Sequence, residues 1–279
     1  MKSLVTLAAI GTAAMIVTAG SGAGGGVVTS PGAETGWEGA LAPGGQVRYV
    51  ALVGDGRETI VAAVRVRGGR VVRWAHLRGA WGVPLVAYDG TKGGLTADGK
   101  TLVLSAPTPN PGPISRFPLL STRTMSLRTT VTLRGRFAFD AVSPDASTLF
   151  LVEYFGIGPN VPYRVRVYDV EAGRLLTGAI VDRLEKEAIM LGQPATRATS
   201  PDGRWAYTLY ARQKGEPFVH ALDTVRREAF CIDLPLRLGQ AKQMKLRLRI
   251  ATGGRTLSVR RGGSLVASID TRTFVVRKG

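Results

Sequence analysis

The stretch Ser200-Pro201-Asp202-Gly203-Arg204-Trp205-Ala206-Tyr207-Thr208-Leu209 sets a tight turn before an apolar run, and this pattern recurs along the chain. Asp and Gly favour tight turns, because Gly accepts a positive φ and Asp bonds to its own following backbone. The other copies are Gly54-Asp55-Gly56, Ala97-Asp98-Gly99, Ser143-Pro144-Asp145-Ala146 and a reduced Thr252-Gly253-Gly254. With Asp55, Asp98, Asp145, Asp202 and Gly253 as equivalent positions, the gaps are 43, 47, 57 and 51 residues. Such a period predicts a β-propeller, in which one four-stranded blade takes about 40–50 residues.

A second landmark follows the turns, at the end of the third strand-like run of a repeat: Leu120-Ser121-Thr122, Tyr168-Asp169, Leu222-Asp223-Thr224 and Ile269-Asp270-Thr271. We therefore predict an all-β protein with five four-stranded blades. In the first repeat the predicted strands are Val47–Val53, Thr59–Val66, Val71–His76 and Trp81–Tyr88, and in the second repeat the first strand is Thr91–Thr96. Six blades are the alternative, with Gly26–Ala42 supplying a degenerate N-terminal blade.

The Ser-Pro-Asp-Gly turn, the aromatic-containing strand after it and the Asp that ends the next strand resemble the blades of bacterial extracytoplasmic propeller repeats of the YVTN and TolB types. The resemblance covers Val47 to Lys278 and implies a scaffold, because these families bind different things on a shared fold. It implies that Asp98, Asp145 and Asp202 are structural and not catalytic. The Gly-His and Trp-Asp pairs of eukaryotic WD-type repeats are missing from this sequence.

The N-terminus has the pattern of a secretory leader. Lys2 precedes an apolar stretch from Leu4 to Ala19, and small residues follow at positions 20–23. We predict a signal peptide over residues 1–23, a flexible Gly-rich linker over 24–45 and the propeller domain over 46–279. The predicted location is secreted or extracytoplasmic, in a bacterial cell envelope, with no membrane span once the leader is cleaved.

The formal charge of +17 is unevenly distributed. Residues 59–88 and 234–269 contain basic side chains and no acid. They belong to the first and last repeats, which are neighbours in a closed ring. Arg65, Arg67, Lys245, Arg247 and Arg249 alternate with apolar residues, and we predict one shared basic patch there. Such a patch would suit an anionic cell-envelope polymer. A nucleic acid is not expected, because the aromatic interleaving of single-strand platforms is missing.

The sequence contains no Gly-x-Ser-x-Gly, His-Glu-x-x-His or Cys-x-x-Cys motif. Gly94–Thr101 matches a phosphate loop by letter, but a strand is predicted where that loop needs a helix. His76 and His220 are expected to be packed strand residues, and Cys231, the single cysteine, a packed core thiol without a partner histidine nearby in sequence. We therefore predict no catalytic residue, no metal site and no cofactor.

Four long connections fall on one predicted face of the ring: Pro107–Pro113, Phe155–Pro162, Asp182–Pro194 and Arg212–Pro217, with a short helix at Asp182–Leu191. Function gathers on irregular loops carried by a rigid scaffold. The candidate binding residues there are Tyr154, Phe155, Asn160, Tyr163, Tyr210, Arg212 and Glu216. The predicted function is a non-catalytic, monomeric binding scaffold, with an unknown protein or an anionic cell-envelope polymer as its partner. The alternative is a propeller hydrolase or lactonase with a metal-assisted site on this face, suggested by Glu153 and Glu216.

Overall fold

The computed structural model describes residues 28–55, 57–182 and 189–279. This part of the chain is all-β apart from one short helix, α1 (Gln240–Gln243). Five antiparallel sheets follow one another along the sequence, and we number them first to fifth. A two-stranded pair, β1 (Ala33–Glu34) with β6 (Val83–Pro84), lies apart from this series.

Each of the five sheets is a meander in which strands adjacent in sequence are hydrogen-bonded neighbours. The first sheet contains β2 (Gly36–Leu41), β3 (Val47–Val53), β4 (Glu58–Arg65) and β5 (Val71–Arg78). The second contains β7 (Thr101–Val103), β8 (Ile114–Ser121) and β9 (Ser126–Arg134). The third contains β10 (Phe137–Val142), β11 (Thr148–Tyr154), β12 (Tyr163–Asp169) and β13 (Arg174–Leu175).

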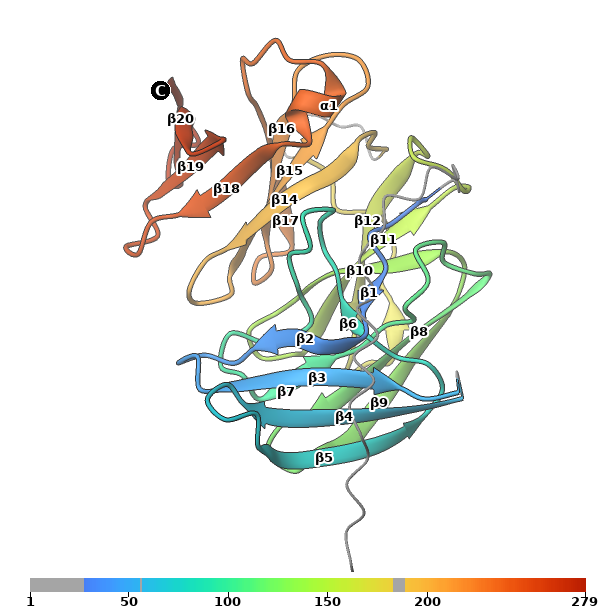
Figure 1. Cartoon of the computed structure of the whole chain (residues 1–279). Helices are drawn as coiled ribbons and strands as arrows, with labels where there is room; N and C mark the ends of the chain where they lie inside the picture. Colours follow the sequence, from blue (N-terminus) through green and yellow to red (C-terminus); the bar gives the residue numbers. More distant parts are fainter. Residues whose placement is uncertain (1–27, 56, 183–188) are drawn as a thin grey trace, which may run out of the picture.

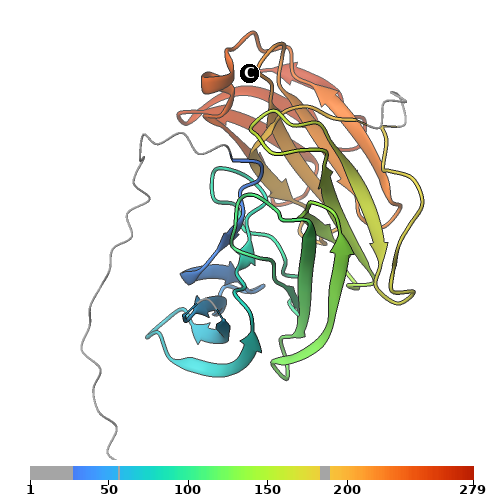
Figure 2. The ribbon, with the colours of Figure 1, turned by 90° about the vertical axis from the view of Figure 1, so that its right-hand side faces the viewer.

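The fourth sheet contains β14 (Gln193–Thr199), β15 (Trp205–Ala211), β16 (Phe218–Asp223) and β17 (Glu228–Asp233). The fifth contains β18 (Leu246–Ile250), β19 (Thr256–Arg261), β20 (Ser264–Asp270) and β21 (Val276–Lys278). In Figures 1 and 2 the sheets are stacked along an arc, from the first sheet at one end to the fifth at the other. Four of the five successive meanders have four strands and the second has three, and this order of sheets is the architecture of a β-propeller.

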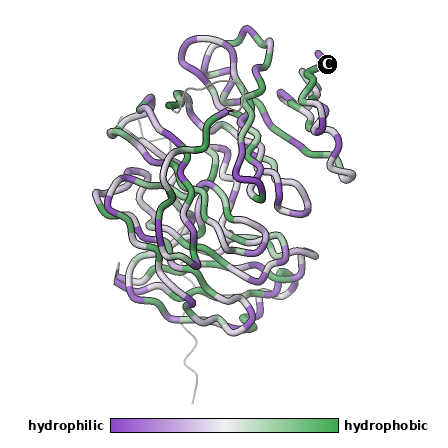
Figure 3. The backbone as a smooth tube through the Cα atoms, turned by 180° about the vertical axis from the view of Figure 1, so that it is seen from behind, coloured by the Kyte–Doolittle hydropathy of each residue, from purple (hydrophilic) through white to green (hydrophobic). Residues whose placement is uncertain are grey.

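Apolar side chains between successive sheets hold the arc together. Separate buried clusters join the first sheet to the second, the second to the third, the third to the fourth and the fourth to the fifth. Figure 3 shows the hydrophobic stretches running along the strands, with hydrophilic residues concentrated at the turns. Each fully buried Leu, Val or Phe in these clusters contributes about 1.5–3 kcal/mol of transfer free energy.

The repeat is built on one turn that joins the first strand position of a sheet to the second. Ala42, Thr96, Ser143, Ser200 and Ala251 each donate the backbone N–H to the carbonyl five residues later, at 2.8–3.0 Å. Each of their carbonyls accepts the N–H from three residues later, at 2.7–2.9 Å. Asp98, Asp145 and Asp202 occupy the same place in this turn. Each carboxylate accepts a hydroxyl bond from two residues before and an N–H bond from two residues after.

The first copy of the predicted repeat was assigned to the wrong turn. The equivalent turn of the first sheet is Pro43-Gly44-Gly45, whereas Gly54 and Asp55 lie in the β3–β4 connection at the other end of the sheet. The strands predicted as first, second and third of this repeat are therefore its second, third and fourth. The predicted fourth strand, Trp81–Tyr88, instead contains β6 and lies beside the second sheet, where Gly82 bridges to Ser105.

Two further predictions need correction. The flexible linker predicted over 24–45 contains β2, the first strand of the first sheet, although these residues are rich in Gly and Ala. Thr91–Thr96 does not form a continuous strand: Lys92 bridges to Leu85 and Leu95 to Leu102, and between them Gly94 has a φ of +83° and lies close to the Val103 carbonyl. The predicted helix at Asp182–Leu191 falls mainly on residues 183–188, which lie outside the described residues.

Candidate functional site

The long connections meet at one end of the sheets, which we call the loop face. Asn160 donates a hydrogen bond to Gln213 at 3.3 Å, joining the 155–162 and 212–217 loops. Residues 28–32 connect the 155–162 loop to the 107–113 loop. The Thr29 hydroxyl accepts a hydrogen bond from the Gly158 N–H, and the Thr29 N–H donates one to the Asn110 side chain. The loop face is therefore a connected surface of hydrogen-bonded loops.

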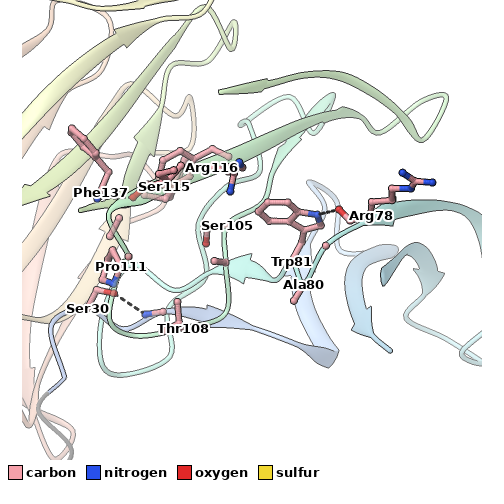
Figure 4. A pocket seen from close by; sticks show the side chains of 18 residues that line it. Ser30, Arg78, Ala80, Trp81, Ser105, Thr108, Pro111, Ser115, Arg116 and Phe137 are labelled. Atoms are coloured by element: carbon pink, nitrogen blue, oxygen red, sulfur yellow. Dashed lines mark hydrogen bonds between the residues drawn. The ribbon is translucent and has the colours of Figure 1, made fainter. Parts of the chain in front are cut away.

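Two pockets open on this part of the molecule. The first, of about 490 Å³, lies between the 28–32 segment and the first three sheets, with Trp81 and Phe137 at its two ends (Figure 4). Several of its polar groups are used within the chain: the Trp81 indole N–H bonds to the Arg78 carbonyl, and Ser115 bonds to Gly135 and Phe137, while the side chains of Arg78 and Arg116 also line the pocket. This pocket is largely apolar and offers little chemistry of its own.

The second, which we call the loop pocket, has a volume of about 440 Å³ and lies between the third and fourth sheets at the loop face. Its apolar lining includes Ile189, Met190, Leu191 and Phe218, and its polar lining includes Asn160, Asp182, Arg212, Lys214, His220 and Cys231. The Arg212 guanidinium lies 4.3 Å from the centre of the Phe218 ring and 3.8 Å from the Asp233 carboxylate. A lining that combines apolar side chains with two cations suits a ligand that has both an apolar and an anionic part.

A row of polar side chains crosses the fourth sheet beneath this pocket. The strand register places Arg197, Thr208, His220 and Cys231 opposite one another on β14, β15, β16 and β17. Arg197 donates its Nε–H to Thr208 at 2.8 Å, and the Cys231 Sγ lies 3.9 Å from Nδ1 of His220. Asp182 accepts the Cys231 backbone N–H. The row therefore leads from the inner strand of the sheet to the wall of the loop pocket.

At its inner end the row is anchored by a buried ion pair. The Arg197 guanidinium bonds to both the carboxylate and the carbonyl of Asp140, and the two side chains are 4% and 3% exposed. Burial lowers the pKa of His220 to about 4, an effect that Asp140 and Asp182 oppose and Arg197 reinforces. His220 is consequently a neutral base at pH 7, and among the described residues its Nε2 has no hydrogen-bond partner.

The sequence-predicted candidates divide between the pocket and the core. Asn160 and Arg212 line the loop pocket. Tyr163 and Tyr210 are buried and stacked at 5.6 Å, and Tyr154 is tilted against Tyr163 at 5.9 Å. Burial raises the pKa of all three phenols well above the ordinary value. These tyrosines support the pocket from below and do not form a rim.

Phe155 is exposed and packs under the Arg164 guanidinium at 5.1 Å, and Glu216 is half-buried outside the lining of the loop pocket. Glu153 is occupied by an ion pair with both Arg164 and Arg166, each at 2.7 Å. Burial opposes but does not outweigh these two arginines, which lower the pKa of Glu153. Within residues 28–55, 57–182 and 189–279, no group of three His, Cys, Asp or Glu side chains could hold a metal ion.

The predicted basic residues lie in two places. Arg247 and Arg249 project from β18 into a hollow of about 310 Å³ that Ser258, Arg260, Gly262 and Gly263 complete, and Lys245 directly precedes this strand. Arg65 ends β4 and Arg67 lies in the turn after it, and neither contributes to that hollow. Arg247 also lies 3.8 Å from the Asp89 carboxylate. A patch shared by both groups stays a prediction.

Sequence reasoning missed His220 and Cys231 as a pair, although the signal was present. The turn after Asp223 sets the register of the β16–β17 hairpin, and counting back from it places His220 opposite Cys231. Asp140 and Arg197 carried no comparable signal, because their contact joins two different sheets. No segment of the described chain forms a helix long and apolar enough to cross a membrane.

Neither the known family models nor the curated proteins contain a match to this sequence. A functionally unknown protein from Desulfotomaculum acetoxidans is similar in structure, with a TM-score of 0.54 and 12% identity over 86% of this chain and 67% of that one. The Cps50 (Swd1) β-propeller domain of Myceliophthora thermophila gives a TM-score of 0.48 and 12% identity over 87% and 65%, respectively. A putative TolB from Agrobacterium tumefaciens gives 0.43 and 13% over 86% and 78%. At these identities the likeness concerns the fold alone, and this chain spans about two thirds of the length of the first two proteins.

Proposed function

We propose that this chain is a secreted, five-bladed propeller that acts as a non-catalytic binding scaffold and takes its ligand in the loop pocket. The observation that carries the proposal is the composition of that pocket: the buried Phe218 ring forms its floor, and the more exposed Ile189, Met190 and Leu191 share its lining with the cations Arg212 and Lys214. The ligand class that fits is a small anionic molecule, or the end of an anionic chain, that carries an apolar group. The leader predicted over residues 1–23 supports an extracytoplasmic location.

A volume of about 440 Å³ is within the range of small-molecule sites, and the floor is held by the stacked Tyr163, Tyr210 and Phe218 rings. Stacking at 5.2–5.6 Å between rings that are 2–3% exposed fixes this floor before any ligand arrives. A preformed floor lowers the entropy cost of binding. Arg212 is itself positioned, since its backbone N–H bonds to the Gln243 side chain at 2.8 Å.

The test uses 8-anilinonaphthalene-1-sulfonate, a fluorescent probe with an aromatic body and one sulfonate. We expect saturable binding to the full chain, weakened about tenfold or more when Arg212→Gln and Lys214→Gln are combined, because both cations of the rim are lost. The matched control is Arg123→Gln with Arg174→Gln, an equal charge change at exposed sites on the second and third sheets. Equal affinity of both double variants would contradict the loop pocket as the site.

The hollow on the fifth sheet supports a second candidate, a surface for an anionic cell-envelope polymer. Arg247, Arg249 and Arg260 converge there, and the exposed glycines at 262 and 263 leave room for a chain to approach. The triple change of these arginines to Gln should lower the salt concentration that elutes the chain from an anionic matrix, because the attraction of this hollow is electrostatic and screened by salt. The control triple Arg123, Arg134 and Arg174 to Gln should elute nearly as the unmodified chain does. Unchanged retention of the first triple would remove this candidate.

A further inference from the structure

The wall of the loop pocket brings together the only thiol of the chain and a buried histidine with capacity to spare. Cys231 and His220 are directly opposite on β17 and β16, with Sγ 3.9 Å from Nδ1. His220 is 2% exposed, lines the pocket, and has no hydrogen-bond partner for Nε2 among the described residues. An imidazole within reach of a thiol is the arrangement that turns a cysteine into a nucleophile.

His220 is neutral in the folded chain, and the groups around it set that state. The charged or titratable groups around it are Asp140 and Arg197 from the inner strands, Asp182 from the neighbouring loop, Cys231, and Tyr210, whose ring packs edge-on against the imidazole. Burial keeps its pKa near 4, so the ring is neutral in the range where a thiol begins to ionise. A neutral ring nitrogen can accept a hydrogen bond from the Cys231 thiol, but a pKa near 4 makes the ring a weak base, so the proton moves only as the sulfur attacks and no stable thiolate forms.

We propose that Cys231 is a modification site, at which its thiol exchanges with small anionic disulfides that enter the loop pocket while His220 receives the thiol proton. This inference rests on the loop pocket as the ligand site. The Sγ–H proton passes to the imidazole, and the Sγ electron pair attacks one sulfur of the disulfide. A new S–S bond forms as the old one breaks, and the departing thiolate takes up a proton. The disulfide is the only co-reactant, and no net oxidant is needed.

The pocket also sets the kind of disulfide and the fate of the product. Arg212 and Lys214 line the same pocket and favour a disulfide that carries carboxylates. Because Cys231 is the only cysteine, no second thiol of the chain can displace the adduct. The mixed disulfide therefore persists until an external thiol removes it, which makes the site a reversible attachment point inside the ligand pocket.

The decisive experiment compares the folded and the urea-unfolded full chain. The probes are 5,5′-dithiobis(2-nitrobenzoate), which is anionic, and 2,2′-dithiodipyridine, which is neutral, and release of the leaving thiol is followed by absorbance. We expect the folded chain to react with the anionic probe at least as fast as the unfolded chain. A merely packed thiol would react far more slowly when folded, on the order of a hundredfold. That slower rate would overturn the proposal without any variant being needed.

Variants then separate the role of His220 in accepting the proton from the role of Arg212 and Lys214 in selecting an anionic disulfide. His220→Asn should slow both probes on the order of a hundredfold, the usual contribution of a positioned base, whereas His76→Asn, at the exposed histidine of β5, should leave the rates unchanged. Arg212→Gln with Lys214→Gln should slow the anionic probe and spare the neutral one. Equal slowing of both probes by this double variant would contradict the charge selection.

Cys231→Ser distinguishes failure of this inference from failure of the binding function. The serine variant should still bind 8-anilinonaphthalene-1-sulfonate, because the floor and the rim cations are intact. Probe binding with an inert folded thiol would overturn the thiol exchange alone. A thiol that reacts rapidly with both disulfides in a chain that binds no fluorescent probe would overturn the anionic ligand pocket instead.

Discussion

The fourth and first sheets have the same meander but opposite surroundings. The fourth lies between two neighbours, and every residue of β16 is buried. The first packs one face on the second sheet through Val61, Ala63 and Leu77, and on the other face exposes Ile60 and Trp74, at 44% and 62%. Where both faces are covered, a charge must be paired, as Arg197 is with Asp140. Where one face is only partly covered, large apolar side chains such as Ile60 and Trp74 remain in water, although Val50, Ala62 and Val64 form a small buried cluster on the same face.

The strongest way to break this comparison is to remove one member of the buried pair. Arg197→Met leaves the Asp140 carboxylate without its cation between two sheets, and we expect a loss of about 3–5 kcal/mol in the free energy of unfolding. Urea unfolding followed by circular dichroism measures it. The control is Lys100→Met, which opens the exposed pair with Asp98 and should change stability by less than about 0.5 kcal/mol. Similar values for both variants would show that the third and fourth sheets are less tightly closed than their burial indicates.

A matched pair of aromatic truncations sharpens the contrast. Phe150 lies between the third and fourth sheets at 0% exposure, and Phe150→Ala should cost about 3–5 kcal/mol through lost burial and a residual cavity. Trp74→Ala, on the open face of the first sheet, should cost less than about 1 kcal/mol, since most of this side chain is already in water. A large loss at Trp74 would mean that this face is covered in solution.

Acid should weaken the covered interface before it affects the open one. The pKa of His220 is lowered from 6.5 in the unfolded chain to about 4, so the unfolded state binds a proton that the folded state refuses. The contribution of neutral His220 to the free energy of unfolding is fully present above pH 6.5. It falls by at most about 3 kcal/mol as the pH drops towards 4. Urea midpoints at pH 7 and pH 5 measure the loss, and His220→Asn should flatten the difference. An identical pH dependence in that variant would contradict a buried neutral histidine.

The smallest expected effect is a gain in stability, at a turn residue with a positive φ. Ala146 takes a φ of +60° at the turn position where the second, fourth and fifth sheets have Gly99, Gly203 and Gly254. Ala146→Gly should raise the free energy of unfolding by about 0.5–1 kcal/mol, because glycine adopts this conformation without strain. Thermal unfolding of the two chains tests it, with Ala172→Gly in the exposed turn after Asp169 as the control. A destabilised variant would show that the buried Ala146 methyl group matters more than its backbone.

The sequence was sufficient to predict the repeat of sheets, but not to identify which turn begins the first sheet. Asp98, Asp145 and Asp202 mark equivalent turns, whereas Asp55 does not, because a tight turn at either end of a strand pair selects the same residues. The true turn at Pro43-Gly44-Gly45 has no aspartate and so left no trace in the pattern. The candidate site was predicted in part for a related reason. Loop lengths indicated Asn160 and Arg212, but the packing of one sheet on another, which buries Tyr163 and pairs Asp140 with Arg197, has no local signature.

The turn of the fifth sheet shows what happens to this loop when the aspartate is absent. Gly253 stands where three other copies have an aspartate, yet Gly254 still donates to Ala251 at 2.7 Å and Ala251 to Thr256 at 2.9 Å. Main-chain bonding alone is therefore enough to shape the loop, and each carboxylate is a reinforcement, worth about 1.5–3 kcal/mol for a hydrogen bond to a charged group. A lineage carrying this chain could thus lose its aspartates one at a time, with each loss too small to unfold the protein. The aspartates that make the repeat visible in the sequence are therefore the residues that this fold can lose most easily.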